Sequence, residues 1–127
     1  MAAIAKRNYG KRAYPVAAGE TINPNQVAFL AAGYLVAFAS AVAANPCAGV
    51  ATFETTNPCA NGDISAEVET GEHKFSNSGD VVAASVGSTA YFVDDSSVSI
   101  SDSGGSRTTA GKVTQVDTDG VWVDIGI

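Results

Sequence analysis

The chain has 127 residues, a formal net charge of −6 and two cysteines. This length suits one domain with a hydrophobic core and leaves little room for a second. Fifteen valines, twelve serines and ten threonines accompany only two leucines and one methionine, so the composition favours sheet over helix. We therefore predict an all-β fold, a single-domain sandwich or barrel of short antiparallel strands with an extended N-terminal arm.

The charge is unevenly distributed along the chain. Residues 1–12 carry four basic side chains and no acidic one, a net charge of +4, whereas residues 13–127 carry three basic and thirteen acidic side chains, a net charge of −10. We divide the chain accordingly into a basic arm, residues 1–12, and a β domain, residues 13–127. The acidic domain argues against nucleic acid as the main ligand, because phosphate binding needs a cationic face. The arm suits an acidic protein surface, and a solvated tail is the alternative interpretation.

An uncharged apolar stretch occupies residues 26–44. A signal peptide or a short membrane span is one interpretation, but residues 19–25 separate the stretch from the basic residues, unlike the compact basic region of a signal peptide. Val27 and Phe29 share a face under strand alternation, as do Tyr34, Val36 and Phe38, with residues 31–33 as the break. We therefore predict two buried strands rather than a helix, and no membrane partner.

Shorter strand candidates follow, separated by Gly, Asn, Asp and Ser; they are residues 48–54, 63–69, 80–85, 88–94, 97–101, 111–117 and 120–126. Residues 94–97 are expected at the tip of one hairpin. Asp119 and Gly120 are expected in the tight turn of a second hairpin, because glycine accepts a positive φ. Beyond that turn Val121, Val123 and Ile125 should face the core, with Trp122 exposed or at an interface.

Both cysteines lie in one stretch, NPCAGVATFETTNPCA, residues 45–60. A disulfide needs Cα atoms about 6 Å apart, and a strand between Cys47 and Cys59 would carry them away from each other. We predict two free thiols, with an intrachain disulfide as the alternative. Each Asn-Pro is interpreted as a bracket around the strand, because proline lacks the N–H that a central strand requires.

The sequence contains no recognisable catalytic or cofactor-binding pattern. His73 with Cys47 and Cys59 gives at most three ligands, fewer than a closed structural zinc site needs, and we expect His73 at a surface strand edge. A cysteine–histidine nucleophile would need an orienting acid and oxyanion donors that the sequence does not indicate. The segment DTDG lacks the remaining ligands of a calcium loop. We therefore predict no enzyme activity, no cofactor, no metal and no small-molecule substrate.

Four segments follow one another in an informative order; they are GETINPNQVAF, AGVATF, GSTAYFVDDSSVSI and TAGKVTQVDTDGVWVDIGI. This order resembles that of the capsid cement, or decoration, proteins of tailed double-stranded-DNA bacteriophages, over about residues 16–127. The resemblance implies a β-rich viral structural protein that binds the outside of an expanded shell, commonly as a trimer. It implies the major capsid protein and further copies of the chain as partners, synthesis in the host cytoplasm, a final location on the virion surface, and no catalytic residues.

The arm is interpreted from its residues, because no family pattern covers it. We expect the cations of the arm to contact acidic groups on a capsid subunit or a neighbouring copy, and two tyrosines to supply apolar contact area. The expected contact residues are Lys6, Arg7, Tyr9, Lys11, Arg12 and Tyr14. The alternative function is a phage tail or fibre component, or an adhesion-type β module of a cell surface.

Overall fold

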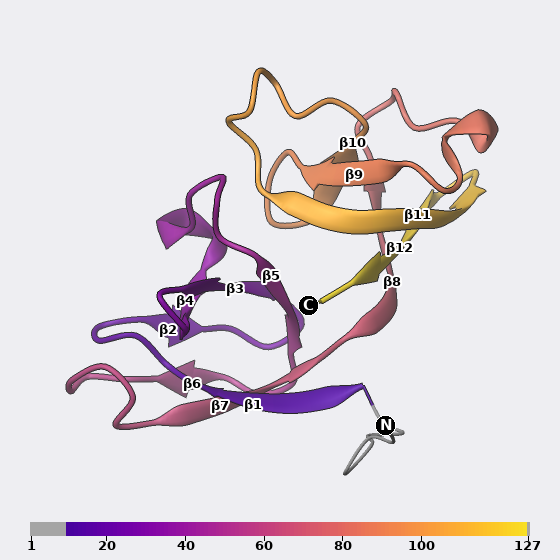
Figure 1. Cartoon of the computed structure of the whole chain (residues 1–127). Helices are drawn as coiled ribbons and strands as arrows, with labels where there is room; N and C mark the ends of the chain where they lie inside the picture. The colour runs from indigo at the N-terminus through magenta and orange to yellow at the C-terminus, as the bar shows by residue number, and fades with distance from the viewer. Residues whose placement is uncertain (1–9, 127) are drawn as a thin grey trace, which may run out of the picture.

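The computed structural model describes residues 10–126, and its regular elements are strands apart from two short 3₁₀ turns (Figure 1). Five strands form an open sheet in the order β1-β7-β5-β3-β4, five form a closed barrel in the order β10-β8-β12-β11-β9, and β2 pairs with β6. The predicted all-β fold is confirmed. The strands are β1 (Lys11–Pro15), β2 (Thr21–Ile22), β3 (Val27–Ala31), β4 (Tyr34–Ala37), β5 (Cys47–Ala51), β6 (Thr55–Thr56), β7 (Ser65–Glu69), β8 (Gly71–Asn77), β9 (Thr89–Phe92), β10 (Ser97–Ser99), β11 (Thr109–Asp117) and β12 (Gly120–Ile125).

The core has two parts, one on each face of the five-stranded sheet. The first, the sheet cluster, consists of Val16, Ile22, Ala28, Leu35, Ala48, Ala51, Ala66 and Val68. The second, the barrel cluster, fills the barrel and continues onto the opposite face of the sheet through Val27, Phe29, Val36, Cys47 and Val50. Strands β3 and β5 therefore carry buried residues on both faces, which explains their uncharged sequences. The two strands predicted within residues 26–44 are confirmed as β3 and β4.

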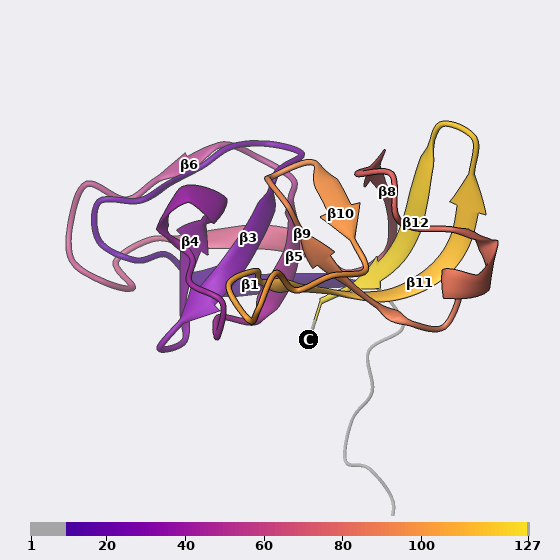
Figure 2. The ribbon, with the colours of Figure 1, turned by 90° about the horizontal axis from the view of Figure 1, so that it is seen from above.

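Strands β7 and β8 form one path from the sheet to the barrel, with Thr70 between them (Figures 1 and 2). Gly71 has a φ of +98°, which lets the chain change direction there at little cost. Strand β1 pairs with β7, and β12 pairs with β8 so that Ile125 lies opposite Gly71. The backbone of Gly10 is hydrogen-bonded to Thr70, so both ends of the described chain meet at this crossing.

The final hairpin turns one residue earlier than the sequence predicts. Asp117 pairs with Gly120, which leaves Thr118 and Asp119 as the two-residue loop. Gly120 is thus the first residue of β12, and its φ is not among the positive ones. The reason for glycine there is space, because a Cβ atom would lie 2.8 Å from the carbonyl oxygen of Phe75.

The strand predicted at residues 80–85 is wrong. The chain there forms an irregular segment and the 3₁₀ turn η2 (Ala83–Ser85). Asp80 accepts hydrogen bonds from the hydroxyls of Ser78 at 2.9 Å and Ser99 at 2.5 Å, and the Ser85 hydroxyl accepts from the Val82 amide at 3.1 Å. The polar side chains of this segment form hydrogen bonds with the backbone and with other side chains. These bonds take the place of pairing with a neighbouring strand.

The boundary predicted between arm and domain falls inside a strand. Strand β1 begins at Lys11, so the last two residues of the predicted arm, Lys11 and Arg12, belong to the five-stranded sheet. Pro46 directly precedes β5, as the bracket interpretation expects, but the second Asn-Pro follows β6. There the fully buried Asn57 donates to the carbonyls of Val16 and Ala60, both at 2.9 Å.

Candidate functional site

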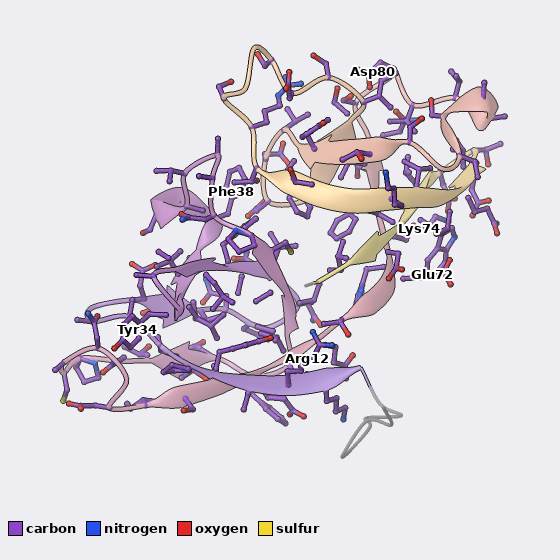
Figure 3. The ribbon with its side chains drawn as sticks, viewed as in Figure 1. Arg12, Tyr34, Phe38, Glu72, Lys74 and Asp80 are labelled. Carbon is purple, nitrogen blue, oxygen red and sulfur yellow. The ribbon has the colours of Figure 1, made fainter. Side chains whose placement is uncertain are left out.

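The structure describes three of the six predicted contact residues, and all three lie in β1 at one edge of the five-stranded sheet. Figure 3 labels one of them, Arg12. They are Lys11, Arg12 and Tyr14. The other three lie outside the described residues; they are Lys6, Arg7 and Tyr9. Strand β1 therefore marks where the basic segment joins the folded body.

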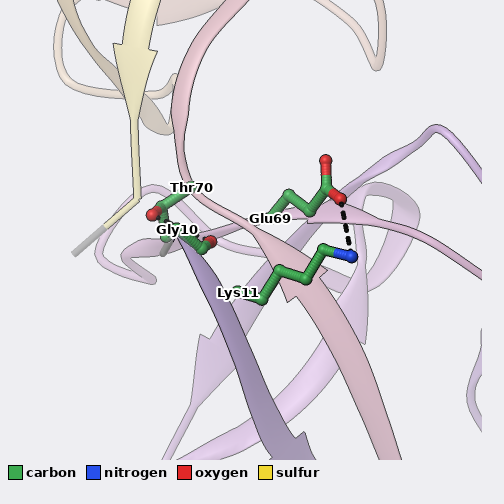
Figure 4. A pocket seen from close by; sticks show the side chains of 4 residues that line it. All are labelled: Gly10, Lys11, Glu69 and Thr70. Carbon is green, nitrogen blue, oxygen red and sulfur yellow. Dashed lines mark hydrogen bonds and ion pairs between the residues drawn. The ribbon is translucent and has the colours of Figure 1, made fainter. Parts of the chain in front are cut away.

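Lys11 pairs with acidic side chains of the neighbouring strand. Its ammonium lies 3.7 Å from Glu69 and 4.0 Å from Glu67 (Figure 4), because β1 and β7 are aligned with Lys11 opposite Glu69. The Lys11 side chain is 59% exposed, so these ion pairs contribute little to stability. They matter for binding instead, because the positive charge of Lys11 is paired with carboxylates of the same chain.

Arg12 and Tyr14 lie on the other face of β1. They are paired with Val68 and Ala66, and directly opposite residues of an antiparallel pair share a face. Both partners belong to the buried sheet cluster, and the half-buried Tyr14 packs against it. Part of the apolar area of Tyr14 therefore packs against the sheet cluster and is not available to a partner. Lys11 lies on the opposite face of β1 from Arg12 and Tyr14, so the three residues do not form one outward surface.

A hollow lies where the described chain begins (Figure 4). Its volume is about 190 Å³, and it is lined by Gly10, Lys11, Glu69 and Thr70. The Gly10 carbonyl accepts two hydrogen bonds from Thr70, from the amide at 2.6 Å and from the hydroxyl at 3.1 Å. These bonds hold Gly10, the first described residue, against Thr70.

A second charged cluster lies on the outer face of the barrel around Trp122, which is half-buried as the sequence analysis allows. The ammonium of Lys74 binds Asp119, lies 3.3 Å from Asp117 and sits 5.8 Å from the centroid of the Trp122 ring. The Trp122 indole donates to Asp117 at 3.0 Å, and Gln115 donates to the same carboxylate at 2.7 Å. The cluster joins β8 to the β11–β12 hairpin, and its groups satisfy one another rather than an outside ligand.

The pKa values in this cluster predict a specific pH response. Its hydrogen bond to Lys74 holds the pKa of Asp119 below the ordinary value near 4, and bonds from Gln115 and Trp122 are the main cause of the lowered pKa of Asp117. The stabilisation is present above the ordinary carboxyl pKa and is lost as pH falls through the lowered values. In Lys74→Met we expect the pKa of Asp119 to return to its ordinary range and that of Asp117 to stay low, as measured by NMR titration of the carboxyl carbons.

The matched control is Lys112→Met. The Lys112 ammonium binds the Thr89 hydroxyl at 3.1 Å instead of a carboxylate of this cluster, so both carboxyl titrations should match the unmodified protein. An Asp119 pKa that is the same in the two variants would contradict the assigned pairing.

The two thiols and the histidine come from different segments: Cys47 lies in β5, Cys59 follows β6 and His73 lies in β8. Cys47 and Cys59 are both free, as predicted, with Cys47 buried and Cys59 exposed. Burial raises the pKa of the Cys47 thiol to about 11, so it is protonated at neutral pH and a weak nucleophile. His73 is half-buried in β8, where it pairs with Val123 of β12 on one side, while β10 pairs only with the far end of the strand. Within residues 10–126, no group of three or more His, Cys, Asp and Glu could hold a metal ion.

The sequence analysis missed several exposed apolar side chains. Phe53 is 67% exposed after β5, and Val82 and Val86 are about half exposed on either side of η2. Phe53 and Val82 lie in segments that were predicted as strands, in which alternate residues face a core. The sequence contained one sign of the exposure of Val82 and Val86. Residues 81–93 carry no charge, and their apolar and polar residues do not alternate as they would in a half-buried strand. Single exposed apolar side chains are common on protein surfaces and do not by themselves mark a contact surface.

Comparison with known proteins finds no matching family model, no matching curated protein and no matching solved structure. The resemblance to capsid decoration proteins therefore stays a prediction carried by the order of the sequence segments. Among the described residues, no helix has the length and apolar character needed to cross a membrane.

Proposed function

We propose that this chain is a capsid decoration protein, which binds the outer surface of a tailed-phage shell and stabilises it by bridging neighbouring capsid subunits. The observation that carries the proposal is the contrast between an acidic body and the basic segment that precedes it in the chain. Residues 10–126 contain five basic and thirteen acidic side chains, a net charge of −8, while Lys6 and Arg7 lie in the preceding nine residues.

The cations of the body are partly balanced by its own acids. Lys11 and Lys74 form ion pairs with carboxylates of the same chain, whereas Arg107 and Lys112 are hydrogen-bonded to neutral oxygens. A partner with an acidic surface would therefore meet its complementary charge chiefly in the N-terminal segment. Charges at the rim of an interface act mostly on the association rate and its salt dependence.

We also propose that copies of the chain contact one another, as a homotrimer on the shell. The motivation is the resemblance to capsid decoration proteins, which are commonly trimers, together with the exposed apolar side chains of Phe53, Val82 and Val86, which subunit contacts could cover. Light scattering across a concentration series should give a mass three times that of the chain, either free or after release from shells. A monomer at every concentration, together with shell images in which copies do not touch, would contradict this proposal.

The N-terminal segment gives the direct test of shell binding. Shells of the phage that encodes the chain, assembled without this protein, would be incubated with the full chain and with a deletion of residues 2–10, which leaves β1 whole. Loss of the two arm cations should weaken binding by about tenfold at low salt, at about 1 kcal/mol or less for each exposed ion pair. Raising the salt should reduce the difference, because screening weakens exposed pairs.

The control for shell binding is Lys112→Gln, which removes a cation from the barrel surface and leaves the segment intact. It should bind as the full chain does. No binding of the full chain to shells would contradict the proposed function, and binding to isolated tails or fibres instead would favour the alternative function. Equal affinity and equal salt dependence of the full and deleted chains would show that the segment plays no part in attachment.

A further inference from the structure

A cavity lies where the five-stranded sheet meets the barrel. Its volume is about 400 Å³, and it is lined by residues of the 3₁₀ turn η1 (Phe38–Ser40) on the sheet side and by the end of β9 and residues 106–108 on the barrel side. Phe38 (Figure 3) and Phe92 supply the aromatic part of the lining, and Val93 adds an apolar side chain that is also exposed. This volume lies within the range of about 300 to 1,000 Å³ found for binding pockets.

Arg107 is the one charged residue among the described residues that line the cavity. Its guanidinium donates to the Ser101 carbonyl at 2.9 Å, which leaves further N–H donors of the fork for a ligand. Within residues 10–126, no carboxylate lies at ion-pair distance from it. Asp102, the nearest acid along the chain, accepts from the Gly104 amide at 3.2 Å instead. Because the arginine fork matches the geometry of a carboxylate, the cavity favours a ligand with a carboxylate beside an apolar group.

One polar group in the wall of the cavity has no partner. Thr108 is 5% exposed, and its hydroxyl is the one buried side-chain polar group of the described residues that forms no hydrogen bond. The Thr108 carbonyl, by contrast, accepts from the Phe92 amide at 3.0 Å. An unpaired buried hydroxyl carries a cost that a bound polar atom removes. It is a second indication, independent of Arg107, that the cavity takes a ligand.

The loop after β5 carries the groups that complement this cavity. Phe53 is 67% exposed, and it is the most exposed large apolar side chain within residues 10–126. The next residue, Glu54, is also exposed and forms no ion pair in the described part of the chain. An exposed aromatic ring by itself marks no contact surface. Here the ring stands beside a carboxylate without a cation, and the cavity offers aromatic lining beside a cation without a carboxylate.

We propose that Phe53 and Glu54 of one copy of the chain occupy the cavity of another copy, with the Phe53 ring against Phe38 and Val93 and the Glu54 carboxylate on Arg107. Loop and cavity are built from different segments, so every copy presents one of each. Contacts of this kind, made head to tail, can close into a ring. This inference rests on the proposed contact between copies and names the surface that forms it, and it does not depend on binding to a shell.

NMR of mixed samples tests the contact between copies. Isotope-labelled F53A/E54Q keeps the cavity but lacks the two loop groups. Unlabelled unmodified chain, added to about 1 mM so that a weak contact is populated, should shift the amide signals of Ala39, Val93 and Arg107 until they saturate. Unlabelled R107Q should produce the same shifts, because it retains the loop. Unlabelled F53A/E54Q should bind at least tenfold more weakly, because it lacks both the aromatic anchor and the carboxylate.

The matched control is unlabelled V82A/E72Q, which removes one exposed apolar side chain and one exposed carboxylate at other places on the body. It should shift the cavity signals as the unmodified chain does. Absence of any shift with the unmodified chain would overturn the proposal, and so would equal shifts with unlabelled F53A/E54Q. Neither result bears on shell binding, which the deletion of residues 2–10 tests separately.

Charge reversal tests the ion pair between copies. Adding R107E to the labelled F53A/E54Q protein should abolish the shifts caused by the unmodified chain, and unlabelled E54R should restore them. If E54R fails to restore them while the labelled protein keeps its amide spectrum outside the cavity, the proposed pairing of Glu54 with Arg107 is wrong. Because R107E also loses the bond to the Ser101 carbonyl, the mixtures with F53A/E54Q decide the proposal should R107E not fold.

Discussion

Replacing Phe92 with alanine is expected to destabilise the protein by about 3 to 5 kcal/mol, the usual cost of truncating a buried phenylalanine. The Phe92 ring is 1% exposed and stacks edge-on against Phe29 of the sheet at 5.7 Å and Phe75 of the barrel at 5.2 Å. The cavity would open where the barrel packs against the sheet, so both parts lose packing together. Denaturant unfolding measures the loss, which is a large share of the roughly 5 to 15 kcal/mol typical of a domain.

The control for this substitution is the next residue, Val93→Ala. The Val93 side chain is 38% exposed, so its truncation should change stability by about 0.5 kcal/mol or less. Two separate unfolding transitions in F92A, one unchanged from the unmodified protein, would show that the barrel and the sheet fold independently and would contradict a shared core.

Replacing Gly111 with alanine should have a comparable effect for a different reason. Gly111 lies at a register shift in β11, between Ala90 of β9 and Ile125 of β12. A Cβ atom added there would lie 2.0 Å from the carbonyl oxygen of Asp124, and a backbone atom in a closed barrel cannot move aside without breaking strand pairing. We expect a loss of about 3 kcal/mol, at the upper end for overpacking, and measure it by denaturant unfolding.

Gly104→Ala separates this steric cost from the cost of backbone conformation. Gly104 has a φ of +74° with no atom within 4 Å of an added Cβ, so only the conformational penalty of about 1 to 2 kcal/mol applies. If G111A is no less stable than G104A, the close approach of β11 to Asp124 does not hold in solution.

The sequence revealed the charge of the candidate site but not the positions of its side chains. The cluster of cations before residue 13 follows from counting, but the fate of each cation depends on strand register. Pairing of β1 with β7 places Lys11 against Glu67 and Glu69 and turns Tyr14 toward the sheet cluster. A shift of one residue would exchange these two faces. The pairing partner lies more than fifty residues away in the chain, so no local pattern reveals it.

The sequence by itself determined the fold class and the local hairpins. Alternating apolar residues predicted β3 and β4, and the short polar run after β9 predicted the hairpin in which the Val93 amide binds the Ser97 carbonyl at 2.9 Å. Both features depend on neighbours within about ten residues, for which periodicity and turn chemistry are sufficient evidence. The buried alternation of Val121, Val123 and Ile125 was predicted for the same reason.

Only the tertiary structure shows how the strands and hairpins assemble into the sheet and the closed barrel. Strand β8 has little apolar alternation, and it exists because β12 pairs along one side and β10 pairs with its end. Gly120 and Gly111 are required by carbonyl groups of neighbouring strands rather than by their own turns. The opposition of Glu72 and Asp124, 52 residues apart in number, likewise arises from barrel closure. Pairing between strands that are distant in sequence sets these positions. Its stability depends on cross-strand neighbours, which no single stretch of sequence contains.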